Sequence, residues 1–495
     1  MYTIGFDVGT SYIKASLMNV AGNCIGTVSV PEKEMAIIVP RERWAEQNPD
    51  SWWENVILAT QKLKSETRFA SNQIKAIGIS YQMHGLVLVD KKGIILRPSI
   101  IWCDSRAVET GELAFQKVGI EKCLNQYLNS PGNFTASKLK WVMENEPEIA
   151  EKIYKAMLPG DFIAMKMTGE ITTTVPGLSE GVFWDFKNNS LADDLLLSLG
   201  IEKSVIPDVV STFGEQAYLS SKAAGKLGLC EGTPITYRAG DQPNNAFSLN
   251  VLNPGEVAAT AGTSAVIYGV GDKAIFDQDS RVNTFAHVNH REDMPRLGTL
   301  LCVNGAGIMN SWLRNTVSPG KDKSYEYMNE KAAQVKPGSN GLKIFPFGNG
   351  AERLLKNQSP SAWIEGLNFN SHTEADLFRA TQEGIANTLN YGIQIIREMN
   401  INASVVRAGQ ANMFLSPVFR EAFVNTTGCV LELYHTDGSL GAARAAAMGL
   451  GIYDDFEDCF KNLKSASRFE PDNQLEREYN ELYNSWLESL NKKII

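Results

Sequence analysis

The tripeptide Gly-Thr-Ser occurs twice in this chain, and both copies lie between short runs of apolar, β-forming residues. The first copy, at residues 9–11, separates the run 2–6 from the run 12–20. The second copy, at residues 262–264, interrupts an apolar run over residues 255–270. An apolar run on each side of a glycine turn predicts a strand, a tight turn and another strand. Because the unit recurs in both halves, we infer an internal duplication and expect two α/β domains.

The length of the chain agrees with this division. Its 495 residues exceed what one hydrophobic core usually serves, so two domains of roughly 200 to 250 residues are expected. The turn cluster Asn253-Pro254-Gly255 lies near the boundary, and we divide the chain at residues 1–245 and 246–495. Ligands are expected in the cleft between the two domains.

Other local patterns predict elements of the first half. A third strand is expected over residues 24–30, which makes the start of the chain a three-stranded meander. Helical periodicity covers residues 49–64, with Asp50 and Ser51 as candidates for the N-cap. Residues 74–80 are typical of a buried strand.

The C-terminal part contains two helical patterns. An alanine-rich run over residues 440–449 predicts a helix that packs closely against its neighbours, because small side chains let backbones approach. Residues 475–490 have the spacing of an amphipathic helix. Residues 463–475 are polar and without period, so we expect an irregular segment there.

Composition limits the partners and the compartment. Hydrophobic residues make up 43% and charged residues 21%, which is typical of globular proteins and excludes disordered, collagen-like and coiled-coil chains. The net charge is -9 and no basic run with interleaved aromatic residues occurs, so we expect a small-molecule partner, no nucleic acid and no membrane. The seven cysteines form no C-x-x-C pair, and no signal or spanning segment is found, which predicts a cytoplasmic protein.

The first glycine turn carries groups that suit a phosphate chain. Asp7 precedes Gly9, Thr10 and Ser11, so a carboxylate, backbone N–H groups and hydroxyls lie together, as a phosphate chain with its Mg²⁺ requires. Glycine lets the backbone come close to a phosphate. The alternative is a simple hairpin turn whose aspartate caps its own backbone. The second copy at residues 262–264 favours two loops that hold one nucleotide from opposite sides.

Together with further motifs, these loops resemble the FGGY family of carbohydrate kinases, and the match follows the order of the family over nearly the whole chain. The resemblance implies two actin-like, ribonuclease H-like ATPase domains with a catalytic cleft between them. It also implies ATP and Mg²⁺ as cofactors and a sugar hydroxyl as phosphate acceptor, and it leaves a homodimer open. The other matching segments are Gln82-Met83-His84-Gly85, Trp102-Cys103-Asp104-Ser105-Arg106, Gly240-Asp241-Gln242, residues 347–353, Gly409-Gln410-Ala411-Asn412 and residues 438–443.

The same resemblance implies a role for each residue. Asp241 would be the catalytic base, and Asp7 and Asp241 would hold the metal. Sugar contacts would come from Gln82, Met83, His84, Gly85, Trp102, Asp104, Arg106 and Gln242. Nucleotide contacts would come from Asp7, Gly9, Thr10, Ser11, Lys14, Gly262, Thr263, Ser264, Gly409, Gln410, Ala411 and Asn412.

The residues themselves leave alternatives open. Asp241 follows a strand-like run in a segment that we expect to be irregular, where it would orient a hydroxyl or stabilise the turn after it. His84 would exchange hydrogen bonds with sugar hydroxyls or be a structural histidine. Trp102, Asp104 and Arg106 would form a pocket wall for a polyhydroxylated ligand, or a core tryptophan beside a surface ion pair.

A further histidine pair has the spacing of metal ligands. His287 and His290 are separated by two residues, but the stretch around them is polar and contains no cysteine framework. We therefore interpret this segment as a solvated loop and not as a zinc site.

The sugar-side motifs are most similar to those of xylulokinases, which makes D-xylulose, giving D-xylulose 5-phosphate, the first expectation. Three residues depart from the usual pattern: Cys103, Gln242 and Gln410. The alternatives are therefore a kinase for another ketose or polyol, such as ribulose, sedoheptulose or a glycerol-like substrate. A non-catalytic sugar- and nucleotide-binding actin-like switch is a third possibility.

Overall fold

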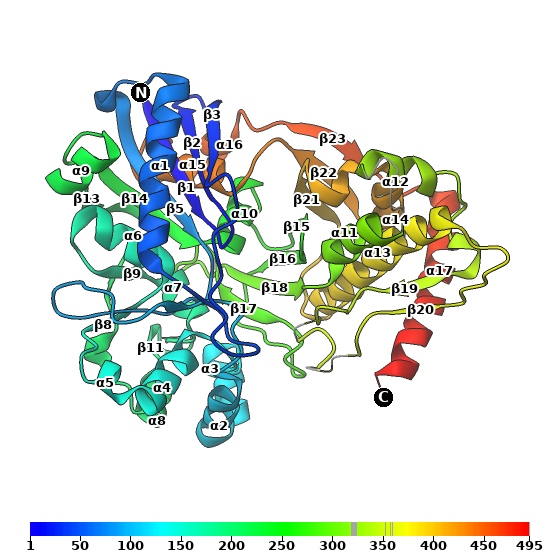
Figure 1. Cartoon of the computed structure of the whole chain (residues 1–495), viewed down its shortest axis with the longest axis horizontal. Helices are drawn as coiled ribbons and strands as arrows, with labels where there is room; N and C mark the ends of the chain where they lie inside the picture. Colours follow the sequence, from blue (N-terminus) through cyan, green and yellow to red (C-terminus); the bar gives the residue numbers. More distant parts are fainter. Residues whose placement is uncertain (318–323, 352, 357, 359, 495) are drawn as a thin grey trace.

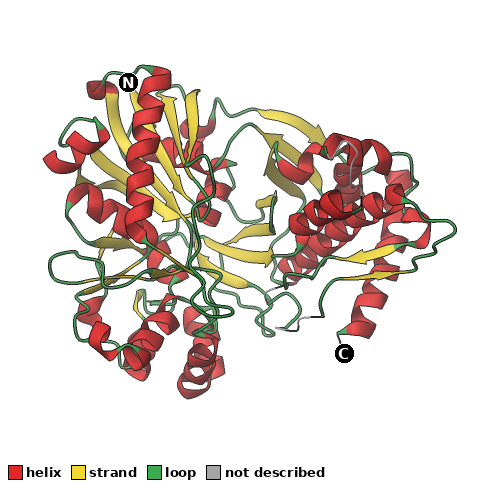
Figure 2. Cartoon of the chain, viewed as in Figure 1, coloured by secondary structure: helices red, strands yellow, loops and turns green. Residues whose placement is uncertain are grey.

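Two larger β-sheets, one in each half of the chain, organise the molecule (Figures 1 and 2). The computed structural model describes residues 1–317, 324–351, 353–356, 358 and 360–494. Helices cover the faces of both sheets, and the N-terminus and C-terminus lie on different halves (Figure 1). The predicted mixed α/β fold with two sheet-rich domains is confirmed.

The first sheet has six strands in the order β13-β14-β5-β1-β2-β3. The first three strands along the chain pair as an antiparallel meander, as predicted, whereas β5 pairs in parallel with β1 and β14 in parallel with β5. Parallel strands direct their carboxyl ends to one edge, so the residues after β1, β5 and β14 meet there. The strands are β1 (Tyr2–Val8), β2 (Ile13–Asn19), β3 (Cys24–Val30), β5 (Ile74–Tyr81), β13 (Phe213–Tyr218) and β14 (Pro234–Gly240).

The second sheet repeats this order and adds one strand, β17, at its edge. β15 and β16 form the antiparallel unit around the second Gly-Thr-Ser turn, while β21 pairs in parallel with β15 and β22 in parallel with β21. The equivalent strand order supports the inferred duplication. The strands are β15 (Val257–Ala261), β16 (Ala265–Gly271), β17 (Asn283–Ala286), β18 (Leu297–Val303), β21 (Val405–Gly409), β22 (Val430–Tyr434) and β23 (Ser465–Phe469).

Helix α1 (Pro49–Thr67) packs on β2 and β3, and its N-cap differs from the expected one. The cap is Asn48, whose side chain accepts a hydrogen bond from the backbone N–H of Asp50. Pro49 then occupies the first turn, where a proline loses no helical hydrogen bond. Asp50 and Ser51 therefore lie inside the first turn of the helix, after Pro49, and are not its cap.

Helix α15 (Gly438–Gly449) returns from the far end of the chain to the first sheet and packs on β1 and β5. A Cβ atom on Gly5 would lie 2.0 Å from the carbonyl oxygen of Ser439, and one on Gly78 would lie 2.1 Å from that of Ala442. Glycine is therefore required in both strands, because the helix backbone touches them. The close packing predicted for this alanine-rich segment is confirmed.

Helices α13 (Glu374–Glu398), α14 (Pro417–Thr427) and α17 (Asn473–Lys493) cover the second half, with α17 packed on α14. The predicted terminal amphipathic helix is confirmed. The segment before it is not irregular throughout, because residues Ser465–Phe469 form β23 against β22. Within the described residues no helix is long and apolar enough to cross a membrane.

The remaining elements are short, and several of them form the lower part of the first half in Figure 1. The shorter strands are β4 (Glu46–Gln47), β6 (Val87–Val89), β7 (Ser99–Ile100), β8 (Lys155–Met157), β9 (Thr172–Thr174), β10 (Trp184–Asp185), β11 (Ser190–Leu191), β12 (Asp208–Val210), β19 (Lys343–Phe345) and β20 (Trp363–Glu365). The other helices are α2 (Val108–Val118), α3 (Ile120–Tyr127), α4 (Thr135–Asn145), α5 (Pro147–Ala150), α6 (Pro159–Thr168), α7 (Val175–Glu180), α8 (Asp193–Leu199), α9 (Ser221–Leu227), α10 (Asp241–Ser248), α11 (Ala306–Thr316), α12 (Tyr325–Ala332) and α16 (Phe456–Phe460).

Candidate active site

Asp7 lies near the carboxyl end of β1 and faces the N-terminus of α15. Its Oδ1 accepts a hydrogen bond of 3.1 Å from the hydroxyl of Ser80 on the neighbouring β5. A Cβ atom on Gly438 would lie 2.6 Å from Asp7 Oδ2, so the first turn of α15 touches the carboxylate. Burial raises the pKa of Asp7, and the nearby charge of Asp437 raises it further, whereas Lys14 lowers it.

The loop after Asp7 is half-buried. Gly9, Thr10 and Ser11 have intermediate exposure, as does Lys14 on the following strand. The Nζ of Lys14 lies 3.9 Å from a carboxylate oxygen of Asp437. A carboxylate, hydroxyls and a cation are thus available at one edge of the first sheet.

Asp241 is the first residue of helix α10, whereas the sequence predicted an irregular segment at this position. The strand β14 ends at Gly240, so the carboxylate lies at the same edge as Asp7. Burial raises the pKa of Asp241 to about 7, with a further contribution from the charge of Asp7, while hydrogen bonds from the backbone and side chain of Gln242 oppose the shift. The two carboxylates therefore lie close enough to influence each other's environment.

Gly240 brings the segment Gln82-Met83-His84-Gly85 next to this aspartate. A Cβ atom on Gly240 would lie 2.6 Å from Cγ of Met83 and 2.4 Å from Oε2 of Glu180. Only glycine fits here, because both neighbours are buried side chains. The segment that carries His84 and the segment that carries Asp241 therefore form one continuous site.

His84 is held in an unusual conformation by several partners. Its φ angle of 61° lies in the left-handed region, which non-glycine residues rarely adopt. Its ring packs against Phe134 at 4.8 Å and Phe285 at 5.3 Å between centroids, and Phe285 comes from the second half of the chain. Burial lowers the pKa of His84 to about 3, with a further contribution from Lys138, so the imidazole is neutral at physiological pH.

Glu180 is a site residue that the sequence reasoning missed. Its backbone carbonyl oxygen lies 2.9 Å from Nδ1 of His84. Because a carbonyl oxygen only accepts, Nδ1 must carry the proton, and Nε2 is left as a hydrogen-bond acceptor. Burial raises the pKa of the Glu180 carboxyl well above its usual value, and Asp241 adds to the effect. Nothing in the local sequence distinguishes this glutamate from a surface residue.

A chain of hydrogen bonds joins the first Gly-Thr-Ser loop to Gln82 and to Trp102, which belong to the two segments expected to contact sugar. The Thr10 hydroxyl donates to Gln82 Oε1 at 3.1 Å and accepts from Trp102 Nε1 at 3.0 Å. Gln82 Nε2 donates to Gln47 Oε1 at 3.2 Å, and Gln47 Nε2 returns to the carbonyl oxygen of Thr10 at 2.8 Å. Gln47, which was also not anticipated, thus fixes the position of the loop.

The second sugar-side motif is divided between the surface and the interior. Trp102 is 37% exposed, whereas the side chains of Asp104 and Arg106 have no exposed surface. Arg106 pairs with Asp104 and with Glu46, both at 2.7 Å. Asp104 and Arg106 therefore form a buried ion pair, and their direct contact with sugar stays a prediction that this burial disfavours.

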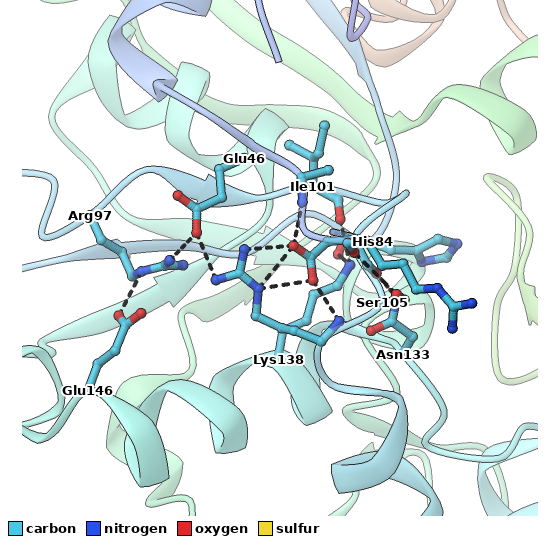
Figure 3. A network of polar contacts seen from close by, with 12 residues as sticks. Glu46, His84, Arg97, Ile101, Ser105, Asn133, Lys138 and Glu146 are labelled. Atoms are coloured by element: carbon cyan, nitrogen blue, oxygen red, sulfur yellow. Dashed lines mark hydrogen bonds and ion pairs between the residues drawn. The ribbon is translucent and has the colours of Figure 1, made fainter. Parts of the chain in front are cut away.

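This ion pair belongs to a larger network (Figure 3). Glu46 also binds Arg97 at 2.5 Å, and Arg97 binds Glu146 at 2.8 Å. On the other side, Lys138 donates to the carbonyl oxygens of His84 at 2.8 Å and Ile101 at 3.1 Å, and burial lowers its pKa to about 8. The network thus ends on the backbone of His84.

The second Gly-Thr-Ser loop meets residues 409–412, the other segment of this half that is expected to contact the nucleotide. A Cβ atom on Gly262 would lie 3.3 Å from Nδ2 of Asn412, and the N–H of Ile308 in α11 donates to the carbonyl oxygen of Thr263 at 3.2 Å. Thr263 and Ala411 are exposed, and Ser264 has intermediate exposure. The two loops therefore form one surface in the second half of the chain.

Gln410 follows Gly409 at the end of β21, and its N–H donates to the carbonyl oxygen of Tyr434 at 2.9 Å. Its buried Oε1 has no hydrogen-bond partner within the described part of the chain. No hydrogen bond or ion pair between described residues links Thr263 to Asp7 or Asp241. The structure therefore brings together the predicted residues of each half, but it does not join the two groups.

Other contacts do connect the halves. Arg353 lies over the ring of Phe134 at 5.2 Å, and the hydroxyl of Ser179 accepts a hydrogen bond of 3.0 Å from the N–H of Ala286. Glu352, which belongs with Arg353 to the matching segment of residues 347–353, lies outside the described residues.

The His287 and His290 pair differs from the predicted solvated loop. His287 is fully buried, and its ring bonds to the Tyr268 hydroxyl and to the carbonyl oxygen of Val251, both at 3.0 Å. Among the residues that the structure describes, no group of three or more His, Cys, Asp or Glu side chains is arranged to hold a metal ion. His287 is a structural histidine that links two strands and a loop.

Comparisons with known proteins agree with this geometry. Residues 2–248 match the model of the FGGY family of carbohydrate kinases, N-terminal domain. The chain is 28% identical to the xylulose kinase of Bacillus subtilis over 97% of this chain and 95% of that protein. Two solved structures share the fold: a ligand-bound xylulose kinase from Lactobacillus acidophilus (TM-score 0.90, 21% identity, 99% and 98% of the chains) and a Plasmodium falciparum glycerol kinase with ADP (TM-score 0.86, 20% identity, 99% and 98%). The chain therefore belongs to the FGGY family of carbohydrate kinases, ATP-dependent enzymes that phosphorylate a sugar hydroxyl.

Proposed function

We propose that this kinase transfers the γ-phosphate of ATP to a terminal hydroxyl of a ketose, with D-xylulose giving D-xylulose 5-phosphate. The observation that carries the proposal is the contact of Gly240 with Met83 and Glu180, which places Asp241 beside the His84 motif. Xylulose kinase is the name of the Bacillus subtilis relative that covers almost the whole chain, which supports the choice of sugar.

His84 would recognise the sugar as a neutral acceptor. Its Nδ1 proton is directed to the Glu180 carbonyl oxygen, so Nε2 is available to accept a hydrogen bond from a sugar hydroxyl. The low pKa keeps this acceptor unprotonated over the whole physiological range. Trp102, which is partly exposed next to Thr10, would cover an apolar face of the sugar.

Asp241 would act as the base. A carboxyl whose pKa is raised to about 7 is ionised in part at neutral pH and can accept the proton of the attacking hydroxyl. In phosphoryl transfer the transition state is loose, so the main contribution of the carboxylate is to orient that hydroxyl. Gln242, which donates hydrogen bonds to Asp241, would hold the carboxylate in place.

The nucleotide would lie between the two Gly-Thr-Ser loops. Its phosphates would be bound by Thr10, Ser11 and Lys14 from the first half and by Thr263 and Ser264 from the second. Asp7 and Asp241 fit Mg²⁺, because an oxygen donor pair at the phosphate site is the usual protein contribution to a nucleotide-bound magnesium ion. When bound, Mg²⁺ neutralises the charge that develops on the transferred phosphoryl group.

The positions of these residues support a separate role in substrate binding for each domain. We propose residues 1–245 as the sugar-binding domain and residues 246–495 as the nucleotide-binding domain, with α15 as a segment of the latter that packs on the first sheet. The adenine would meet Gly409, Gln410, Ala411 and Asn412. The unpaired Oε1 of Gln410 would accept a hydrogen bond from the exocyclic amino group.

The test is a coupled assay of ADP release with Mg²⁺-ATP and a panel of sugars. D-xylulose should give the highest kcat/KM, and ribulose, sedoheptulose and glycerol should give lower values. A higher value for another ketose or for glycerol would replace the substrate but keep the reaction. If no sugar or polyol stimulates ADP release while ATP still binds, the chain is a nucleotide-binding switch and the proposal is wrong.

A further inference from the structure

A cavity of about 760 Å³ opens on the first half of the chain, on the side of α6 and α9. Its lining comes from the turn after β6, from β8, from the end of α6 with β9, and from α9. None of the active-site residues named above is among the described residues that line it. The cavity is therefore separate from the ATP and sugar sites and has no part in the proposed reaction.

The charge of this cavity is opposite to that of the protein. The chain carries a net charge of -9, yet acidic residues contribute only Glu170 and Asp208 to the lining. Six lysines face them: Lys91, Lys92, Lys155, Lys166, Lys222 and Lys226. Like charges that converge from four separate segments repel one another, and an anion would relieve this repulsion.

Most of these lysine side chains make no hydrogen bond or ion pair with another described residue. Lys166 pairs with Asp50 at 2.9 Å, and Lys155 donates to the carbonyl oxygen of Ile206 at 2.8 Å. The side chains of the remaining four, Lys91, Lys92, Lys222 and Lys226, are exposed and have no hydrogen-bond or ion-pair partner among the described residues. Four free ammonium groups around one concavity are available for a ligand.

The shape limits the kind of anion. The volume is within the range of about 300 to 1,000 Å³ that small-molecule sites occupy, which favours a small molecule over a nucleic acid or a membrane. Trp53 and Tyr154 add aromatic surface to the lining, which suits a ligand with an organic body between its charged groups. Lysine is a flexible point charge that binds phosphate without a fixed geometry.

From this geometry we propose that the cavity binds a small organic molecule with two or more phosphate groups, at a site distinct from the catalytic cleft. The ligand would place its phosphates against the lysines of α9 on one side and the lysines of the turn after β6 on the other. A single phosphate would reach only one of these groups and would bind more weakly.

The test is isothermal titration calorimetry at low and at physiological salt with four probes: inorganic phosphate, pyrophosphate, a hexose bisphosphate and ATP. The variant Lys222→Gln/Lys226→Gln removes two charges from the cavity wall. The control Lys492→Gln/Lys493→Gln makes the same change of net charge at the exposed end of α17. Because ATP also binds the catalytic cleft, only the part of its binding that the cavity variant weakens is assigned to the cavity. Comparison of that part with the binding of the hexose bisphosphate distinguishes a nucleotide from a sugar phosphate as the ligand.

The expected result is that affinity rises from phosphate to the bisphosphate, and that the cavity variant weakens binding of the bisphosphate about tenfold while the control does not. In the unmodified protein, the bisphosphate should also protect Lys91, Lys92, Lys222 and Lys226 together from acetylation, as read by mass spectrometry. Equal affinities in the two variants, or protection of none of the four lysines, would overturn the proposal. Binding of RNA or anionic vesicles, with no binding of phosphate, pyrophosphate or the hexose bisphosphate, would overturn it in favour of a macromolecular surface.

Discussion

Asp241 carries the largest predicted effect of any single residue. Replacement by asparagine keeps the size of the side chain and the start of α10 but removes the proton acceptor. Turnover with sugar should fall by a factor of about 10² to 10⁴, whereas the Michaelis constants for sugar and ATP should change far less. Steady-state kinetics of Asp241→Asn and Asp7→Asn test this: Asp241→Asn keeps one side-chain oxygen for the metal but loses the base, whereas Asp7→Asn keeps the base and should mainly raise the concentrations of Mg²⁺ and ATP that are needed. Near-normal turnover in Asp241→Asn would remove this residue from the mechanism.

The raised pKa of Asp241 predicts the direction of the pH dependence. A base works in its ionised form, so kcat/KM should increase as the pH rises through about 7 and then reach a plateau. His84 should not add a second step between pH 5 and pH 8, because its pKa is lowered to about 3. A profile that is flat from pH 5.5 to pH 8 would contradict the assignment of Asp241 as the base.

The raised pKa of Asp241 also predicts that protein stability falls over the pH range in which catalysis increases. The pKa of Asp241 rises from 3.8 to about 7 on folding, so between these values the folded state holds more protons, and this group lowers the free energy of unfolding as the pH rises. Asp241→Asn should therefore have a higher Tm than the wild type at pH 8, with a smaller difference at pH 5. Thermal unfolding at the two pH values measures this, and a lower Tm for the variant at pH 8 would show that the carboxylate stabilises the fold.

Lys138 should act on the sugar through His84. Lys138→Met keeps the apolar stem but removes the donor that holds the carbonyl oxygen of His84 in its left-handed conformation. We expect the KM for sugar to rise about tenfold with the KM for ATP unchanged. His84→Ala should show the same pattern, and the double variant should be little worse than His84→Ala alone. An equal increase in the KM for ATP in either variant would argue against this positioning role.

At the residue scale, sequence reasoning found the groups that follow strands and missed those whose role depends on distant partners. Asp7 and Asp241 follow apolar runs, and the family resemblance implied a shared metal site for them, although their common sheet edge was seen only in the fold. The burial of Asp104 and Arg106 could not, because it depends on Glu46, which is far away in the sequence. Glu180 was missed for the same reason, since only the fold brings it to His84 and Gly240.

At the scale of elements, the contact of α15 with β1 and β5 should be intolerant of any added atom. Gly5→Ala would place a methyl group about 2 Å from backbone atoms of the helix, which cannot move aside as a side chain would. We expect a loss of about 2 kcal/mol or more in the free energy of unfolding, measured by chemical denaturation. Gly225→Ala in α9 is the matched control, because its Cβ would meet no atom within 4 Å and alanine favours helix. Equal stability of the two variants would mean that α15 does not pack as described.

Helices and strands were predicted correctly where a single local sequence pattern was sufficient to identify them. The strands around both Gly-Thr-Ser turns, and β5, have apolar runs bounded by turn residues. The segment Ser465–Phe469 was missed because a polar edge strand has neither a continuous apolar run nor a clear alternation. Likewise, the polar sequence around His287 concealed a histidine that is buried by strands from other parts of the chain.

At the scale of the molecule, the nucleotide would have to draw the two halves together. No hydrogen bond or ion pair among described residues links Thr263 to Asp7 or Asp241, although both loops are needed around one triphosphate. Small-angle X-ray scattering should therefore show a smaller radius of gyration with sugar and an unreactive ATP analogue than without ligands. The contact of Ser179 with Ala286 lies between the halves, and it should persist if it belongs to the hinge. An unchanged radius would contradict closure.

The return of α15 to the first sheet also determines when that sheet can be completed during synthesis. β1, β2, β5 and β14 leave the ribosome long before residues Gly438–Gly449, which cover one of their faces. Until then the face around Gly5 and Gly78 must remain open or be covered by something else, and it is the kind of apolar surface that chaperones bind. The first half of the chain thus needs α15, a helix near the C-terminal end of the sequence, to reach its native core.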